Sequence, residues 1–316
     1  MGGNIEVASW IALSITSSTS LILLMKQVKR HLSCKYTTTL STFHFLSTWT
    51  LLEIFAFFGL IRRFEQIPFR KRFNLAFLVM TSIVGMNFNL AANSIGFYQM
   101  SKLCCIPYML IWNTFVNKMT YTKKEVLSLT ILLFGVGLFS VSDVEVNLLG
   151  TVYAIISIVS TAHNQMITHD LQKEYSLNGP ELQLAIMPEE FSLGLISATF
   201  LENISDDTFA ASELSINDIC LLLGTCFFAI GVNLATFGLI GKTSSVTYQV
   251  VGHVKTILLL IFGYIFFPSP WESTNQMLRA ISGIIIALIG VFMYTKIRLN
   301  LANQPKDPEK EPLIKK

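Results

Sequence analysis

Charged residues are scarce in this chain. Asp, Glu, Lys and Arg together make up 14% of its 316 residues, whereas hydrophobic residues make up 52% and the mean hydropathy is +0.55. A soluble globule needs more polar surface than this composition supplies. The sequence therefore predicts a polytopic membrane protein and argues against a soluble enzyme.

Motifs for catalysis and metal binding are also lacking. The chain has no GxSxG, HExxH or P-loop pattern. Its cysteines form no CxxC pair and no metal-ligand spacing with histidine, and we interpret them as reduced, mostly buried residues: Cys34, Cys104, Cys105, Cys220 and Cys226. We expect no enzymatic activity, no metal and no cofactor.

Hydrophobic runs of membrane length divide the chain. About 20 helical residues cross the hydrocarbon core, and the hydropathy predicts ten such spans near residues 7–25, 37–61, 74–94, 97–117, 124–142, 147–168, 182–201, 217–239, 244–267 and 277–297. The expected fold is an all-α membrane protein with a single domain over residues 1–302. The Pro-, Lys- and Glu-rich tail, 303–316, is expected to be disordered and cytosolic.

The basic residues indicate the orientation. They gather on the side of both termini, in the segments 62–72 and 118–124 and in the tail, whereas the segments 143–145 and 202–218 on the opposite side are acidic. Cytoplasmic loops carry an excess of Lys and Arg, so both termini are expected to be cytosolic, although the basic loop 26–35 goes against this trend. The sequon at Asn203 would then be lumenal and open to glycosylation.

Internal similarity divides the spans into two halves. Asn-Leu-Ala occurs at residues 89–91 and again at 233–235, and a Tyr-Gln pair starts the next span in each case, at 98–99 and 248–249. Because each half holds an odd number of spans, the two repeats, 6–142 and 147–297, must be inverted. Inverted repeats place the substrate near the midplane at their interface.

Lys255 is the residue whose position says most about function. It lies in the middle of the apolar segment 243–267, where a lysine costs roughly 2.5–3.5 kcal/mol on insertion scales and should face protein or a water-filled cavity. Lys102 lies early in the run 97–116, where snorkelling to the interface is the alternative. Two embedded cations with no carboxylate beside them in sequence indicate a site for a negatively charged solute.

Other polar residues share the faces of the Lys255 helix. Positions i, i+4 and i+7 lie on one face, so one stripe holds Tyr248, Gly252 and Lys255, and its neighbour holds Gln249, His253 and Thr256. These side chains offer hydrogen bonds, and the glycine leaves a gap through which a ligand could approach. The alternative is that they join helices, as polar residues do in membranes.

Span four repeats this arrangement. Tyr98 and Lys102 stand at i and i+4, and Pro107 interrupts the backbone ladder just beyond. Asn89 and Asn233 suit either hydrogen bonding to a ligand or a structural contact between repeats. The serine-rich run 14–20 in span one predicts close helix packing, with a ligand contact as the alternative.

The adjacent carboxyl groups of Glu189 and Glu190 are unusual within a span, because carboxylates in lipid are expensive unless they are protonated or paired. Three alternative explanations are a proton-coupling role, pairing with Lys255, and a different boundary for the span.

The segment 241–267, GKTSSVTYQVVGHVKTILLLIFGYIFF, together with NSIGFYQMSKL at 93–103, resembles the triose-phosphate translocator and nucleotide-sugar transporter family of the drug/metabolite transporter superfamily. The resemblance covers essentially the whole chain and implies ten spans, inverted halves and cytosolic termini. It also implies that Lys102 and the pair Lys255-Thr256 hold substrate phosphate. The Lys-Thr pair resembles the KT group, which includes plant transporters of UDP-rhamnose/UDP-galactose, UDP-xylose and UDP-arabinose, whereas plastid phosphate translocators carry Lys-Arg at this place.

The sequence thus predicts an antiporter of the Golgi membrane, or alternatively the ER membrane, that exchanges a UDP-sugar for UMP by alternating access. Its substrate-binding residues are expected to be Lys102, Lys255, Thr256, Tyr98, Tyr248, Gln249, Gly252, His253, Asn89 and Asn233. Membrane lipid surrounds it, no nucleic-acid polymer is expected to bind, and a homodimer is left open. The alternatives are a proton-coupled exporter of drugs or organic cations that uses Glu189 or Glu190, a sugar-phosphate or phosphate antiporter, and a non-transporting scaffold.

Overall fold

The computed structural model describes residues 2–32, 36–93, 95–140, 147–202, 215–266 and 274–302. Within these ranges all regular structure is α-helical. The helices are α1 (Gly2–Leu32), α2 (Thr37–Phe57), α3 (Phe69–Ala92), α4 (Ile95–Leu103), α5 (Cys105–Phe115), α6 (Lys123–Ser140), α7 (Leu148–Glu174), α8 (Gly179–Leu201), α9 (Ile216–Lys242), α10 (Ser245–Phe266) and α11 (Thr274–Ala302). Asn203 and the tail 303–316 lie outside the described residues.

Helices α4 and α5 together occupy the fourth predicted span. Pro107 has no N–H to donate to the carbonyl of Leu103, one turn earlier. At that point the helical turn is narrower than in an α-helix, because the backbone N–H of Cys104 bonds to the carbonyl of Ser101 at 3.0 Å, three residues back rather than four. The proline therefore ends α4 just after Lys102. Counting α4 and α5 as one passage gives ten helical passages in the described residues.

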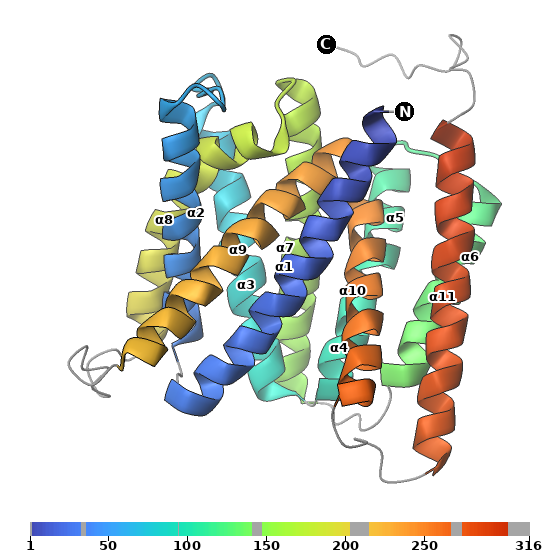
Figure 1. Ribbon diagram of the computed structural model, residues 1–316. Helices are drawn as coiled ribbons and strands as arrows, with labels where there is room; N and C mark the ends of the chain where they lie inside the picture. Colours follow the sequence, from blue (N-terminus) through green and yellow to red (C-terminus); the bar gives the residue numbers. More distant parts are fainter. Residues whose placement is uncertain are drawn as a thin grey trace, which may run out of the picture.

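Several helices are suited to a membrane. In the described ranges α1, α3, α8, α9 and α11 contain segments long and apolar enough to span one. The Gly2 end of α1 and the Ala302 end of α11 lie at the same end of the bundle (Figure 1), as an even number of passages requires. The prediction of a multi-pass, all-α membrane protein is confirmed.

The helix pairs are symmetric between the two halves. Replacing each helix of a packed pair by its counterpart in the other half gives another packed pair, or the same one. Helix α1 packs along α9, and its counterpart in the second half, α7, packs along α3. Helix α2 faces its counterpart α8, and α6 faces its counterpart α11. In Figure 1, α1 lies along α9 on one side and next to α10 on the other. Two inverted five-helix repeats produce this pattern, while their boundaries, 6–142 and 147–297, stay a prediction.

Close helix contacts are built on small residues. A Cβ added to Gly231 of α9 would collide with Ser17 of α1, and one added to Gly135 of α6 would collide with the α11 backbone at Ala287. Helices in lipid associate by close van der Waals packing, which small residues permit. The serine-rich run 14–20 thus packs closely, as the sequence predicts, and fixes α1 against α9.

Candidate anion-binding site

Lys255 lies near the middle of α10, and its side chain reaches α1. Its Nζ donates hydrogen bonds to the hydroxyl oxygens of Ser14 and Ser18, at 3.1 and 3.3 Å. The same atom lies 5.5 Å from the ring centroid of Tyr248. Among the described residues all of these partners are uncharged, so no carboxylate neutralises the ammonium. A cation held in this way within a membrane bundle can bind an anion.

Lys102 lies in the last turn of α4. Its Nζ is 4.1 Å from the ring centroid of Tyr98, a cation–π distance. With the side chains that the structure describes it forms no ion pair. Like Lys255, Lys102 is therefore a half-buried cation without a described counter-ion.

The face of α10 beside Lys255 carries further polar groups. Gln249 donates from Nε2 to Oε1 of Gln165 on α7 at 3.1 Å, so it joins two helices. His253 is 6% exposed, and its Nε2 has no partner among the described residues. This ring nitrogen is therefore buried without a described partner, whereas the Gln249 amide is already engaged.

Two of the predicted donors are satisfied within the protein. The Thr256 hydroxyl donates to the carbonyl oxygen of Gly252 at 3.2 Å, and the Tyr248 hydroxyl shares a hydrogen bond with Thr236 at 3.0 Å. Each hydroxyl would have to turn to donate to a phosphate. Their roles in substrate binding stay predictions.

Gly252 adjoins open space. Among the described residues, a Cβ added there would meet only Oε1 of Gln249, at 4.0 Å. Gly231 differs from Gly252, because a Cβ added to Gly231 would collide with Ser17 and the glycine is therefore required for helix packing. Packing does not require Gly252, and this agrees with the predicted gap for a ligand.

Asn89 and Asn233 form contacts inside the protein. Asn89 donates to the Ser101 hydroxyl at 2.9 Å and accepts from Asn93 at 2.8 Å. Asn233 donates to the Thr48 hydroxyl of α2 at 2.9 Å. In this conformation both asparagines therefore form structural contacts within the protein, which was the alternative to hydrogen bonding with a ligand.

Sequence reasoning did not identify Ser14 and Ser18 as the partners of Lys255. Their spacing, i and i+4, places both on one face of α1, but no local pattern shows that α10 lies opposite. Lys255 is separated from Ser14 by 241 positions in the sequence.

The carboxyl groups of α8 lie apart from this site. Glu189 pairs with Arg72 of α3, with Nη2 and Oε1 at 3.1 Å, so pairing with Lys255 is not observed. Glu190 is 1% exposed, and both of its oxygens lack partners among the described residues. Both polar atoms of the fully buried Gln183, seven positions earlier on α8, lack them too. The two carboxyl groups thus have different environments.

A cavity of about 640 Å³ lies beside α10. Val7, Ala8 and Ile11 of α1 form one wall, and α10 and α11 form the others, with Lys242 and Arg298 among the lining residues. Its α10 wall includes Val251 and Val254, both within one turn of Lys255. Lys255 itself is not among the lining residues.

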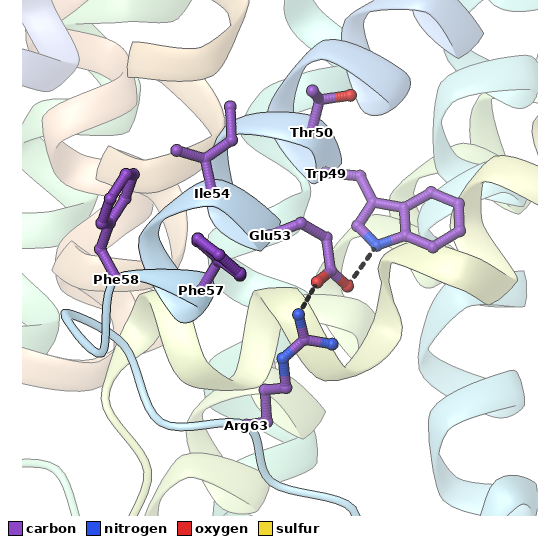
Figure 2. Close-up of a pocket in the computed structure, with 7 residues that line it drawn as sticks. All are labelled: Trp49, Thr50, Glu53, Ile54, Phe57, Phe58 and Arg63. Atoms are coloured by element: carbon purple, nitrogen blue, oxygen red, sulfur yellow. Dashed lines mark hydrogen bonds and ion pairs between the residues drawn. The ribbon is translucent and has the colours of Figure 1, made fainter.

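A second cavity, of about 470 Å³, lies at the end of α2 (Figure 2). Trp49 donates from Nε1 to Glu53 at 3.1 Å, and Arg63 forms an ion pair with the same carboxylate. Figure 2 shows both side chains directed at Glu53. Because its arginine is already neutralised, this cavity is a weaker anion site than the surroundings of Lys255.

Comparison with known families identifies the architecture. The model of the Triose-phosphate Transporter family matches residues 5–295. The chain belongs to this family. It is therefore a transporter and not an enzyme, in agreement with the sequence prediction.

Individual plant transporters resemble the chain over most of its length. UDP-xylose transporter 3 of Arabidopsis thaliana is 33% identical, and the match covers 96% of this chain and 87% of the relative. UDP-rhamnose/UDP-galactose transporter 2 of the same plant is 29% identical, with coverage of 92% and 82%. One solved crystal structure matches with a TM-score of 0.65 at 9% identity, over 92% of this chain and 98% of that one. This last likeness concerns the fold alone.

Proposed function

We propose that this protein is a nucleotide-sugar antiporter that imports a UDP-sugar into the Golgi lumen and exports UMP by alternating access. The observation that carries the proposal is the position of Lys255, an ammonium in the middle of α10 whose described partners are all neutral. A cation of this kind favours an anionic solute over a cationic one. The diphosphate of a UDP-sugar supplies that charge.

Lys102 supplies a second positive charge. Together the two lysines match a diphosphate better than a single charged group, and the unpartnered Nε2 of His253 offers a further polar contact. If the empty site, with two unneutralised lysines, reorients poorly across the membrane, the site can return only with a bound anion. Transport is then an exchange of one anion for another. The substrate then has to be replaced by another anion for each cycle.

The choice of UDP-sugars is supported by the relatives named for UDP-xylose and for UDP-rhamnose/UDP-galactose. Lys255 is followed by Thr256 rather than by an arginine, whose planar fork would suit a terminal phosphate. The substrate class we propose is therefore a UDP-linked pentose, deoxyhexose or hexose.

A liposome exchange screen tests the proposal. Purified protein is reconstituted into vesicles preloaded with UMP, GMP, CMP or phosphate, and radiolabelled UDP-xylose, UDP-galactose, UDP-rhamnose and GDP-mannose are offered outside. We expect uptake of at least one UDP-sugar from UMP-loaded vesicles. Uptake of GDP-mannose alone, or exchange of phosphate alone, would contradict the substrate class.

Glu190 favours a second candidate, a proton-coupled exporter of organic cations. Its carboxyl group is buried and unpartnered among the described residues, and such groups in membrane helices often belong to proton relays. Glu189 is a weaker candidate for this role because Arg72 neutralises it. The same vesicles distinguish the two functions, since an exporter of this kind would respond to a pH gradient and bind cations.

A further inference from the structure

Helix α1 makes two different contacts with its neighbours. Toward α9 it packs closely, because Ser17 fits against Gly231, and Trp10 lies where a Cβ on Gly238 would be. Toward α10 it approaches at fewer places, and there Lys255 donates hydrogen bonds to Ser14 and Ser18. Separating α1 from α10 therefore disrupts little packing, whereas separating α1 from α9 disrupts a tight interface.

The cavity beside α10 limits the α1–α10 contact further. Val7 and Ile11 line this cavity, and Ser14 and Ser18 continue the same face of α1. On α10, Val251 and Val254 line it within one turn of Lys255. The cavity thus lies between these parts of the two helices, and Lys255 and Ser14 are each within one turn of residues that line it.

These hydrogen bonds compete directly with the proposed substrate. The ammonium has three donors, and two of them are occupied by neutral hydroxyl groups. A phosphate oxygen carries a negative charge that a serine hydroxyl lacks, so Coulomb attraction favours transfer of the ammonium to the phosphate. One donor is left for a ligand, so the ammonium can give a phosphate group two or more hydrogen bonds only by withdrawing at least one from the serines.

We propose that Ser14 and Ser18 form a latch that the substrate releases. In the empty transporter they hold Lys255, and with it α1, against α10. Substrate phosphate takes the ammonium from the two hydroxyls, and α1 becomes free to move in the step that changes access. This inference rests on the proposed function, and it attributes the immobility of the empty carrier to the hydrogen bonds of Lys255 rather than to the charge of the lysines alone.

The latch joins the two halves of the molecule, because Ser14 and Ser18 lie on α1 of the first half and Lys255 lies on α10 of the second. Lys102, on α4 of the first half, rests on the Tyr98 ring and forms no hydrogen bond to a hydroxyl group among the described side chains. If the Lys102 ammonium moved from the Tyr98 ring to a phosphate, no described hydrogen bond between two helices would break. The two lysines therefore have different tasks, binding for Lys102 and binding with release for Lys255.

The test compares wild type with the double variant Ser14→Ala/Ser18→Ala and with the control Ser9→Ala. Ser9 lies on the same helix but is exposed, and among the described residues its hydroxyl bonds only to the carbonyl of Ile5, within α1. In UMP-loaded vesicles all three proteins should exchange UDP-sugar. In empty vesicles the double variant alone should take it up, about tenfold or more above wild type, the size expected for losing hydrogen bonds to a charged group.

Hydrogen exchange of the α1 backbone gives a readout that does not depend on transport. UMP should raise exchange around Ser14 and Ser18 in wild type. In the double variant, exchange should be high without ligand, and UMP should add nothing further. Equal exchange in the two ligand-free proteins, or no uptake by the variant into empty vesicles, would overturn the latch.

Failure of the latch and failure of the proposed function can be distinguished. If wild type transports no UDP-sugar, the substrate assignment is wrong, but the ligand-free exchange of α1 still reports whether the serines hold it. If the double variant is unstable, Ser18→Ala alone replaces it, because Ser14 is 1% exposed and its loss disturbs packing more.

Discussion

The guanidinium of Arg72 on α3 lies 3.1 Å from the carboxylate of Glu189 on α8, and only 9% of the Glu189 side chain is exposed. This pair joins the two halves of the protein, because α3 belongs to the first repeat and α8 to the second. It also removes Glu189 from the group of unpaired charges. Glu190 is left as the buried carboxyl group of α8 whose oxygens have no described partner.

Removing Arg72 should destabilise the protein. Arg72→Ala leaves Glu189 buried without its counter-ion, and breaking a buried ion pair costs about 3–5 kcal/mol, with the lower end expected because 27% of the Arg72 side chain is exposed. The melting temperature of the purified protein measures the effect. Arg70→Ala, an exposed neighbour on the same helix, should leave it unchanged, and equal melting of the two variants would contradict the pair's structural role.

Lys255→Ala should abolish exchange with little effect on folding. The ammonium is not a packing residue, and its loss removes a contact to a charged ligand of about 1.5–3 kcal/mol, or roughly a tenfold or larger loss of UMP affinity. Lys255→Arg should restore activity only partly, because a planar fork differs in shape from a point charge. Calorimetric UMP binding and vesicle exchange measure both variants. Wild-type exchange by the alanine variant would refute the anion site.

Gly252 offers a test of ligand position. A methyl group there meets no atom closer than 4.0 Å, so Gly252→Ala should fold normally and gain up to about 1 kcal/mol of stability from its helix propensity. The bulkier Gly252→Val should lower UMP affinity while the melting temperature stays close to that of wild type. Gly231→Ala, by contrast, should lower the melting temperature because its Cβ collides with Ser17. Unaltered affinity in Gly252→Val would show that the ligand does not approach here.

Counter-exchange and proton coupling give opposite results for Glu190→Gln. In the proposed antiporter, uptake of UDP-sugar needs UMP inside the vesicle and is nearly indifferent to an imposed pH gradient, and the glutamine variant keeps its exchange rate. The single substitution is preferable to replacing both carboxyl groups, because Glu189→Gln would break the pair with Arg72. Uptake that is driven by a proton gradient and lost in Glu190→Gln would identify this residue as the coupling group.

The orientation can be tested by labelling. A tag after Lys316 should be digested from the cytosolic side of sealed vesicles, and Asn203 should be glycosylated in a eukaryotic cell, because the positive-inside rule places the basic side in the cytosol. The shared end of Gly2 and Ala302 (Figure 1) requires that an N-terminal tag behave in the same way. A protected C-terminal tag would reverse the orientation.

The sequence by itself determined the class of the protein and the positions of its unusual charges. Span length and hydropathy are local properties of the chain, so the helices and the embedding of Lys255 could be predicted without the fold. The break near Pro107 was predictable for the same reason, since the missing N–H is a property of the residue.

Only the tertiary structure decided the partners of these residues. Lys255 reaches Ser14 across 241 positions, and Glu189 reaches Arg72 rather than Lys255. Such contacts depend on which helices are neighbours and on how each is rotated about its axis. Those two quantities are set by close packing at positions such as Ser17 and Gly231, where the shapes of two distant segments fit together, and hydropathy carries no information about them.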